Sequence, residues 1–407
     1  MRDFLRRHKR KFITASVVTA GLYYAYSYAT SRLRDISDRA TDERTAKDNL
    51  KRRFKQNQQD ATFNVIAFMP ELSEKILEAL KVESITAELQ AQKQGRSTTT
   101  GGSLAEDDTA SMRSGYSEIT HSTLGRRSKL ELWNDVKITS ITRIFSLYYC
   151  IALLVLFTRI QLNLIGRGNY VASVMSIVDE EGEAKITLSD ESVDGSGANN
   201  NNNNNALTRE YMTFTWFLLN RGWSGVVDRV KGAVEEVFSR LEVREDITLS
   251  QIRLLTSRVR SVIEFNGSGD DHYDWLPHVL PPRDQEAGVL QEGGSGTGSV
   301  SPDLRALLDE SAREMGSQES ALLISRCLDL GLAQLLEVKL KAAFNGRDKM
   351  RVANVLPVMT REAHVVGNQQ PNEYLQSINA ISELDGFSAR LFTSFEVGPP
   401  MDGAGCM

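Results

Sequence analysis

The feature that most limits the possible folds is an uncharged run from Ile144 to Thr158, with Arg143 before it and Arg159 after it. Its fifteen residues would cover about 22 Å as a helix, whereas the hydrocarbon core of a bilayer is about 30 Å thick. The run is therefore short for a membrane span. A helix of this length that is apolar on all sides is typical of the buried centre of a bundle. We expect an all-α domain built around it.

The helix that contains this run has recognisable start and stop signals. Ser128 and Glu131 have the S-x-x-E spacing of a capping box, which starts a helix at Lys129. Gly166 and Gly168 are residues of the kind that end one. The predicted helix has about 36 residues and is roughly 54 Å long. The expected fold is thus an elongated helical bundle around one very long central helix.

The rest of the chain also has a helical pattern, with little of the alternation that marks strands. Apolar residues recur at three- and four-residue spacing in stretches centred near Leu80, Val230, Leu255 and Leu330. Gly, Ser, Thr and Asn interrupt the pattern near residues 92–127, 187–206 and 266–302. Such segments cannot bury enough apolar surface to order themselves, so we expect flexible insertions there.

The amino terminus has the composition of a membrane anchor. After a basic run, the segment from Phe12 to Ala29 contains no charge. As a helix it would cover about 27 Å, and its tyrosines suit a membrane interface. A cleaved signal peptide is the alternative, because Ser27 and Ala29 offer a small-x-small cleavage pattern. The helical pattern continues beyond Ala29, which favours an anchor. We expect a basic segment with a single transmembrane anchor over residues 1–35, and a helical domain over residues 36–407.

Composition argues against several functional classes. The chain has 407 residues, a net charge of -5 and a pI near 5.7, which disfavours nucleic acid as the main partner. The three cysteines lack the spacing of a disulfide framework or a zinc site: Cys150, Cys327 and Cys406. The five histidines also lack metal-binding spacing: His8, His121, His272, His278 and His364. No catalytic, cofactor-binding or metal-binding residues are predicted, and a non-enzymatic protein is expected.

Trp133 is an unusual residue on the long helix. Lys129, Trp133 and Lys137 are spaced at i, i+4 and i+8, so the indole lies between two ammonium groups on one stripe. One interpretation is a tryptophan at the edge of the bundle, with lysines extending around it. The other is an aromatic anchor in a partner interface, rimmed by positive charge.

Four blocks of the sequence resemble the peroxin-3 family of peroxisome biogenesis factors: RRHKRKFI, SITAELQ, SKLELWNDVKITSITR and LLVLFTRIQLNLIG. The long polar insertions suggest a fungal member. The resemblance implies a membrane-anchored docking factor that binds the amino-terminal helix of peroxin-19, a chaperone and receptor for new peroxisomal membrane proteins. Recognition would place a helix in an apolar groove.

The same resemblance indicates which residues form the groove. Trp133 matches the family's groove tryptophan, with Lys129 one turn before it and Val136 beside it, while Thr86 and Leu89 supply the facing wall. Glu88 stands where the family has a leucine, so the contact beside Leu89 stays open. The candidate partner-binding residues, with the lysine that follows the tryptophan, are Thr86, Leu89, Lys129, Trp133, Val136 and Lys137.

The resemblance also implies a location. We expect a single-pass protein of the peroxisomal membrane in contact with peroxisomal or ER lipid, with a route through the ER open. By the same resemblance, the basic run in residues 1–35 is part of a targeting signal and the docking domain over residues 36–407 is cytosolic, although the basic run itself favours a cytosolic amino terminus. Further partners in organelle inheritance or turnover are also open. Two other functions are compatible with the residues: an adaptor or tether on another organelle, such as the mitochondrial outer membrane, and a membrane-bound enzyme whose site the sequence does not reveal.

The anchor gives a first testable prediction. If residues 12–29 span a bilayer, the full-length chain stays in the membrane pellet during carbonate extraction, because apolar burial does not weaken at high pH. A chain that begins at Lys51 should be soluble and monodisperse. Recovery of the full-length chain in the carbonate supernatant would contradict the prediction.

Overall fold

The computed structural model describes residues 44–97, 127–180, 198–267, 271–294 and 298–394. The expected anchor over residues 1–35 and most of the first two expected insertions lie outside these ranges. The chain divides into two compact units, residues 1–57 and 58–407. Residues 44–57 of the first unit are helical, and the second unit begins with helical residues 58–79.

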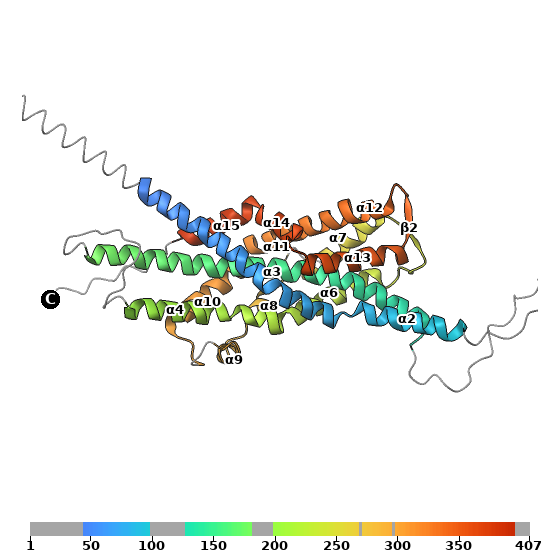
Figure 1. Cartoon of the computed structure of the whole chain (residues 1–407), viewed down its shortest axis with the longest axis horizontal. Helices are drawn as coiled ribbons and strands as arrows, with labels where there is room; N and C mark the ends of the chain where they lie inside the picture. The colour runs from blue at the N-terminus through green and yellow to red at the C-terminus, as the bar shows by residue number, and fades with distance from the viewer. Residues whose placement is uncertain (1–43, 98–126, 181–197, 268–270, 295–297, 395–407) are drawn as a thin grey trace, which may run out of the picture. The chain divides into compact units, whose positions relative to one another are not determined.

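The second unit is almost entirely helical, which confirms the predicted all-α class (Figure 1). Its further α-helices are α2 (Val82–Ser97), α3 (Lys129–Glu180), α4 (Ala198–Thr213), α5 (Thr215–Phe217), α6 (Trp223–Phe238), α7 (Leu249–Glu264), α8 (Leu276–Val279), α9 (Glu286–Glu292), α10 (Pro302–Met315), α11 (Gln318–Ala333), α12 (Lys341–Phe344), α13 (Val352–Asn368), α14 (Glu373–Asn379) and α15 (Ser382–Thr393). Two π-helical segments, η1 (Leu218–Gly222) and η2 (Gln334–Leu340), interrupt the series.

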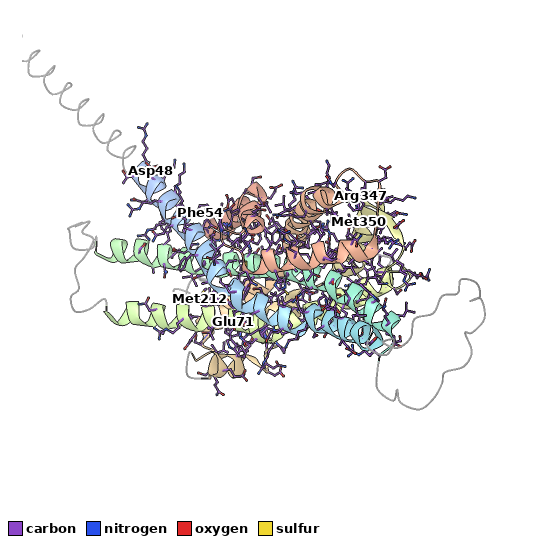
Figure 2. The ribbon with its side chains drawn as sticks, turned by 45° about the vertical axis from the view of Figure 1, so that its right-hand side comes forward. Asp48, Phe54, Glu71, Met212, Arg347 and Met350 are labelled. Carbon is purple, nitrogen blue, oxygen red and sulfur yellow. The ribbon has the colours of Figure 1, made fainter. Side chains whose placement is uncertain are left out.

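The described strands form one short ribbon. β1 (Asp246–Thr248) pairs antiparallel with β2 (Lys349–Arg351). Ile247 lies opposite Met350, which is labelled in Figure 2, and both side chains are buried. The ribbon therefore joins the connection between α6 and α7 to the start of α13.

Helix α3 is the centre of the fold, as the uncharged run predicts. Helices α2, α6, α10, α11, α13 and α15 all pack against it. Every residue from Ile144 to Thr158 is buried. Among the described residues, Lys129–Ser173 is the one helical stretch long and apolar enough to cross a membrane, and its most apolar window is wholly buried within the protein. The run is therefore a core helix, as expected.

The two arginines that bracket the run are also buried, and each has specific partners. The Arg143 side chain is 2% exposed and the Arg159 side chain 3%. Arg143 contacts Glu83 of α2, whereas Arg159 donates to Asn379 at 2.9 Å and lies 3.3 Å from Asp385 of α15. Since a buried unpaired charge is costly, these partners fix which elements cover each end of the run.

Helix α3 is longer than predicted. It continues through Gly166 and Gly168 to Glu180, so the expectation that these glycines end the helix is wrong. Glycine lowers helix propensity by about 1 kcal/mol per residue but does not by itself break a helix. Arg167, between the two glycines, donates to Glu310 at 2.8 Å and to the carbonyl oxygen of Ser394 at 2.8 Å. These tertiary contacts favour the helical conformation at this turn.

The predicted insertion over 266–302 also differs from the structure. Residues 271–294 contain α8 and α9 and pack on the core, so the expectation of a flexible segment is wrong for them. Trp275 stacks on Tyr149 of α3 with ring centroids 5.1 Å apart. Residues 271–294 are rich in glycine and proline, but most of their few apolar side chains are buried and hold the segment against the core.

The start of α6 accommodates this segment through a close backbone approach. A Cβ placed on Gly222 would lie 1.7 Å from the carbonyl oxygen of His278, which follows Trp275 at the start of α8. No ordinary side chain fits at that distance. Gly232, farther along α6, has no atom within 4 Å of the corresponding position.

This contrast gives a prediction about stability. Gly222→Ala should lower the melting temperature and destabilise the fold by about 1 to 3 kcal/mol, because it overpacks a closed backbone contact. Gly232→Ala is the matched control and should be neutral or stabilising by up to about 1 kcal/mol through helix propensity. Thermal unfolding followed by circular dichroism measures both, and equal melting temperatures for the two variants would contradict the packing described.

Candidate partner-binding site

The candidate site begins at the first turn of α3, where the predicted capping box is present. The Ser128 backbone N–H donates to a Glu131 carboxylate oxygen at 2.8 Å, and the Glu131 N–H donates to Ser128 Oγ at 3.2 Å. This reciprocal pair satisfies two N–H groups that the helix itself leaves free. It fixes the start of α3 and hence the direction in which Trp133 points.

Helix α2 lies antiparallel to the first turns of α3. Near the start of α2, Glu83 binds Arg143, and near its end the Gln92 side chain donates to the carbonyl oxygen of Arg127 at 3.2 Å. These two contacts bracket the segments that carry the candidate residues. The structure therefore brings Thr86 and Leu89 of α2 to the same end of the unit as Trp133 (Figure 1).

The candidate residues differ in their exposure. Leu89 and Val136 are buried, so they belong to the core on which the accessible residues of the site pack. Thr86 is half-buried, and its hydroxyl donates to the carbonyl oxygen of Glu83 at 2.9 Å. Trp133 is half-buried and packs against the core, whereas Lys129 is exposed. The indole thus has one face on the protein and another toward solvent.

Sequence reasoning missed one residue of this surface, Leu130. Its exposed fraction is 80%, the largest among the exposed large apolar residues of the described chain. Leu130 lies three residues before Trp133, and residues at i and i+3 are neighbours on a helix surface. Leu130 and Trp133 are therefore neighbouring apolar side chains on the surface of α3. The signal was present in the sequence as Leu130 within SKLELW, between two charged residues.

Lys137 does not join this surface, and the expectation that its ammonium lies beside the tryptophan in solvent is wrong. The residue is 1% exposed. Its Nζ donates to the carbonyl oxygens of Phe238 at 2.7 Å and Leu241 at 2.5 Å, at the end of α6. Burial lowers the pKa of the Lys137 ammonium, while the carbonyl groups at a helix carboxy terminus favour a cation. Lys137 therefore joins α3 to α6.

A charged clamp holds α2 in place. The Arg143 guanidinium donates to both carboxylate oxygens of Glu83 at 2.7 and 3.1 Å, and also to the carbonyl oxygen of Leu77 at 3.2 Å. His364 Nε2 of α13 lies 3.0 Å from the same carboxylate. Partial burial opposes ionisation of Glu83, but the hydrogen bonds from Arg143 and His364 outweigh it and lower its pKa to about 2.

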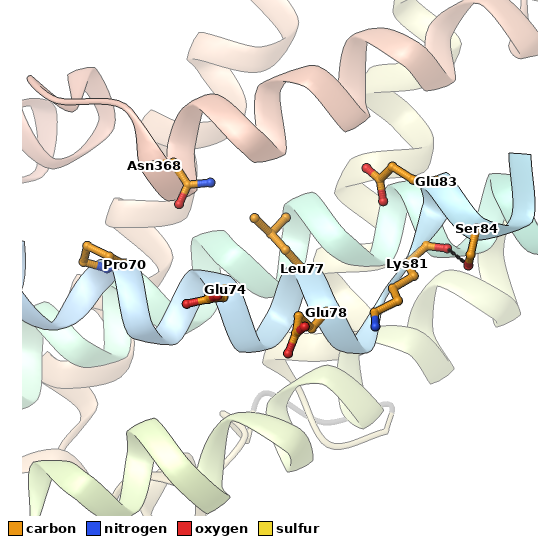
Figure 3. Close-up of a pocket in the computed structure, with 8 residues that line it drawn as sticks. All are labelled: Pro70, Glu74, Leu77, Glu78, Lys81, Glu83, Ser84 and Asn368. Carbon is orange, nitrogen blue, oxygen red and sulfur yellow. Dashed lines mark hydrogen bonds between the residues drawn. The ribbon is translucent and has the colours of Figure 1, made fainter. Parts of the chain in front are cut away.

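A hollow of about 510 Å³ lies where the helical residues before α2 meet the end of α13, and Glu83 forms part of its wall. The lining residues, drawn in Figure 3, are Pro70, Glu74, Leu77, Glu78, Lys81, Glu83, Ser84 and Asn368. The Ser84 hydroxyl donates to the carbonyl oxygen of Lys81 at 2.8 Å and so tightens the turn into α2. None of the residues predicted to bind a partner lines this hollow.

The described residues contain no group of three or more His, Cys, Asp or Glu side chains that could hold a metal ion. The two buried thiols, Cys150 and Cys327, have a pKa raised by burial, which disfavours the reactive thiolate. The side chains present at the candidate site, Leu130, Trp133 and Lys129, offer apolar and electrostatic contact.

These features define an all-α protein that presents an aromatic and apolar surface at one end of its central helix. A family model described as Peroxin-3 matches residues 3–394, so the chain belongs to the peroxin-3 family. The family gives the chain a role in peroxisome biogenesis at the peroxisomal membrane.

Individual relatives agree with this assignment over nearly the whole chain. The chain is 33% identical over 433 residues to peroxisomal biogenesis factor 3 of Yarrowia lipolytica, covering 97% of this chain and 99% of that protein. It is 26% identical to the peroxisomal membrane protein PEX3 of Komagataella phaffii, with 96% and 98% covered. It is 22% identical to human peroxisomal biogenesis factor 3, with 97% and 96% covered. Identity is higher to these two fungal relatives than to the human one.

The clamp generates a prediction about acid stability. Because the folded-state pKa of Glu83 is below its ordinary value of 4.5, its ionised form stabilises the fold above about pH 4.5, and this contribution is lost as the pH falls toward 2. Glu83→Gln should destabilise the protein by about 1 to 3 kcal/mol at neutral pH, since buried Arg143 loses its carboxylate. Between pH 5 and pH 2, a span of about three pH units, the free energy of unfolding of Glu83→Gln should also fall less than that of the parent.

Urea unfolding at several pH values measures this effect. Glu78→Gln is the control, because Glu78 has no ion pair in the described part of the chain, and this variant should follow the parent at each pH. A Glu83→Gln curve parallel to that of the parent would show that the clamp does not contribute.

Proposed function

We propose that the chain is a docking factor of the peroxisomal membrane that binds the amino-terminal helix of the peroxin-19 receptor and so enables membrane protein insertion. The observation that carries the proposal is exposed Leu130 next to half-buried Trp133 on the first turns of α3, a helix end that the capping box and α2 support. Large apolar side chains in this position are typical of a surface that receives the apolar face of a helix. Docking of this kind requires no catalysis.

Each part of the site has a role in this proposal. Trp133 supplies a rigid aromatic contact, Leu130 extends the apolar surface, and Leu89 and Val136 form the supporting floor. Lys129 lies at the rim, where a charge steers association more than it holds the complex. The same proposal includes single-pass attachment through residues 12–29, a cytosolic position for the rest of the chain and a route through the ER.

The peroxin-3 assignment favours this function over the tether on another organelle and over the membrane-bound enzyme. Imaging of the full-length protein with peroxisomal and mitochondrial markers separates docking at peroxisomes from a mitochondrial tether. A purely mitochondrial signal would contradict the proposal.

The main test concerns Trp133. Trp133→Ala should lower affinity for a peptide of the receptor's amino-terminal helix by roughly 30-fold to 1,000-fold, because truncating an aromatic anchor costs about 2 to 4 kcal/mol. Its melting temperature should stay close to that of the parent, because one face of the indole is already in solvent. Isothermal titration calorimetry measures the affinity and circular dichroism the stability.

Two further substitutions sharpen the test. Leu130→Ala removes an exposed side chain, so it should leave stability unchanged and weaken binding by about fivefold to 30-fold. Lys129→Ala should cost about 1 kcal/mol or less, and added salt should remove its effect but not that of Trp133→Ala. Trp216→Ala is the control, because Trp216 is also half-buried against the core but lies on α5. Unchanged affinity in both Leu130→Ala and Trp133→Ala would overturn the proposal.

A further inference from the structure

A second hollow, of about 600 Å³, lies in the second unit where α5, the segment around α8 and α10 meet. Its wall is mostly apolar and includes the side chains of Phe217, Leu276, Leu280, Pro281, Leu308 and Ala312. We call this hollow the α10 pocket. A concave apolar surface of this size suits a ligand that buries apolar side chains.

The last described residue, Ser394, is held beside α10. Arg167 of α3 donates to Glu310 of α10 and to the carbonyl oxygen of Ser394, both at 2.8 Å. One turn earlier in α15, Arg390 donates to Glu314 of α10 at 2.6 Å. These two contacts show that α15 runs antiparallel to α10. The chain beyond Ser394 therefore starts toward the amino-terminal half of α10, which carries much of the α10 pocket.

Residues 395–407 are long enough to reach the pocket from this point. A helix is about 10 Å across and an extended chain covers about 3.3 Å per residue, so about six residues suffice to pass around α10. Ala306, one turn before Glu310, is exposed and leaves room for a crossing chain on the outer face of α10. With this path, Pro400 and Met401 come to the pocket.

The chemistry of this segment matches the pocket. Val397, Pro399, Pro400 and Met401 are apolar, and no basic residue lies between them. Proline-rich segments dock in apolar grooves at low entropic cost, because their extended conformation is already favoured. At the edge of the pocket the Arg283 side chain is 76% exposed. Its guanidinium offers a partner of opposite charge to an acidic residue that follows the apolar run.

We propose that residues 395–407 fold back over α10 and occupy the α10 pocket with Pro399, Pro400 and Met401. The family model matches the chain only as far as residue 394, so the segment lies beyond the matched part. Its attachment at Ser394 gives it an effective concentration at the pocket of about millimolar, which favours it over apolar segments of other proteins. The pocket shares no residue with the docking surface at Leu130, so this inference does not rest on the docking proposal.

Thiol labelling of the full-length chain in phosphatidylcholine vesicles tests the proposal. The reporter is Ala312→Cys combined with Cys406→Ser, because the other two cysteines are buried. A water-soluble maleimide should label this reporter about fivefold or more slowly than in the same protein with Val397→Asp and Met401→Asp. A pocket that is occupied about 80% of the time or more is open for at most about one-fifth of it.

Matched variants support this comparison. Val397→Leu/Met401→Leu keeps the apolar character of the segment and should label as slowly as the parent. Pro282→Cys, at an exposed position between α8 and α9 that also lines the pocket, is a second reporter in case Ala312→Cys does not fold. Leu254→Cys lies on α7 outside the pocket and should label equally with every version of residues 395–407.

The outcomes distinguish the possible occupants. A synthetic peptide of residues 395–407 at about millimolar concentration should restore slow labelling to Val397→Asp/Met401→Asp. Equal labelling of the pocket reporters with the parent and the Asp-substituted segment overturns the proposal. Slow labelling that disappears at low protein density in the vesicles shows a second copy of the chain as the occupant, and also overturns it. Receptor-peptide affinity of Trp133→Ala is measured separately, so the two proposals can fail independently.

Discussion

The structure depends on the burial of the uncharged run of α3 between two arginines. A helix that is apolar on all sides must be covered on all sides, and helices α2, α6, α10, α11, α13 and α15 meet that requirement. Arg143 and Arg159 add a second requirement, because each is almost fully buried and must be neutralised. The apolar run thus specifies how much must pack on α3, while the arginines specify that α2 covers one end and α15 the other.

The candidate site lies where this covering ends. Beyond Arg143 toward its amino terminus, α3 is flanked by α2, by α13 through Thr360 and Ser140, and by the end of α6. At the first turns of α3, Leu130 is exposed and Trp133 is half-buried, so these two apolar side chains are accessible. The clamp of Glu83 and Arg143 belongs to the covering of the core and also sets the position of the site's second wall. Stability of the core and shape of the site therefore share one interaction.

Much of this could be predicted from the sequence because the signals are local. The capping box at Ser128, the three- and four-residue spacing of the helices and the length of the uncharged run all act within a few turns. The failures depend on contacts between distant residues. Helix α3 passes Gly166 because Arg167 is held by Glu310, and residues 271–294 are ordered because Trp275 reaches Tyr149. Neither partner can be identified from spacing along the chain.

Lys129 and Lys137 show the limit of such reasoning most clearly. Both are one helical turn from Trp133, one before and one after, so periodicity assigns them the same stripe. The end of α6 covers Lys137 and offers it two carbonyl oxygens, whereas Lys129 is exposed and no element of the described residues covers it. Helical spacing determines the direction of a side chain, but the neighbouring element determines whether that direction leads to solvent or to the core. Of the two lysines, only Lys129 is accessible to a partner, and Lys137 instead links the helix that carries Trp133 to the rest of the bundle.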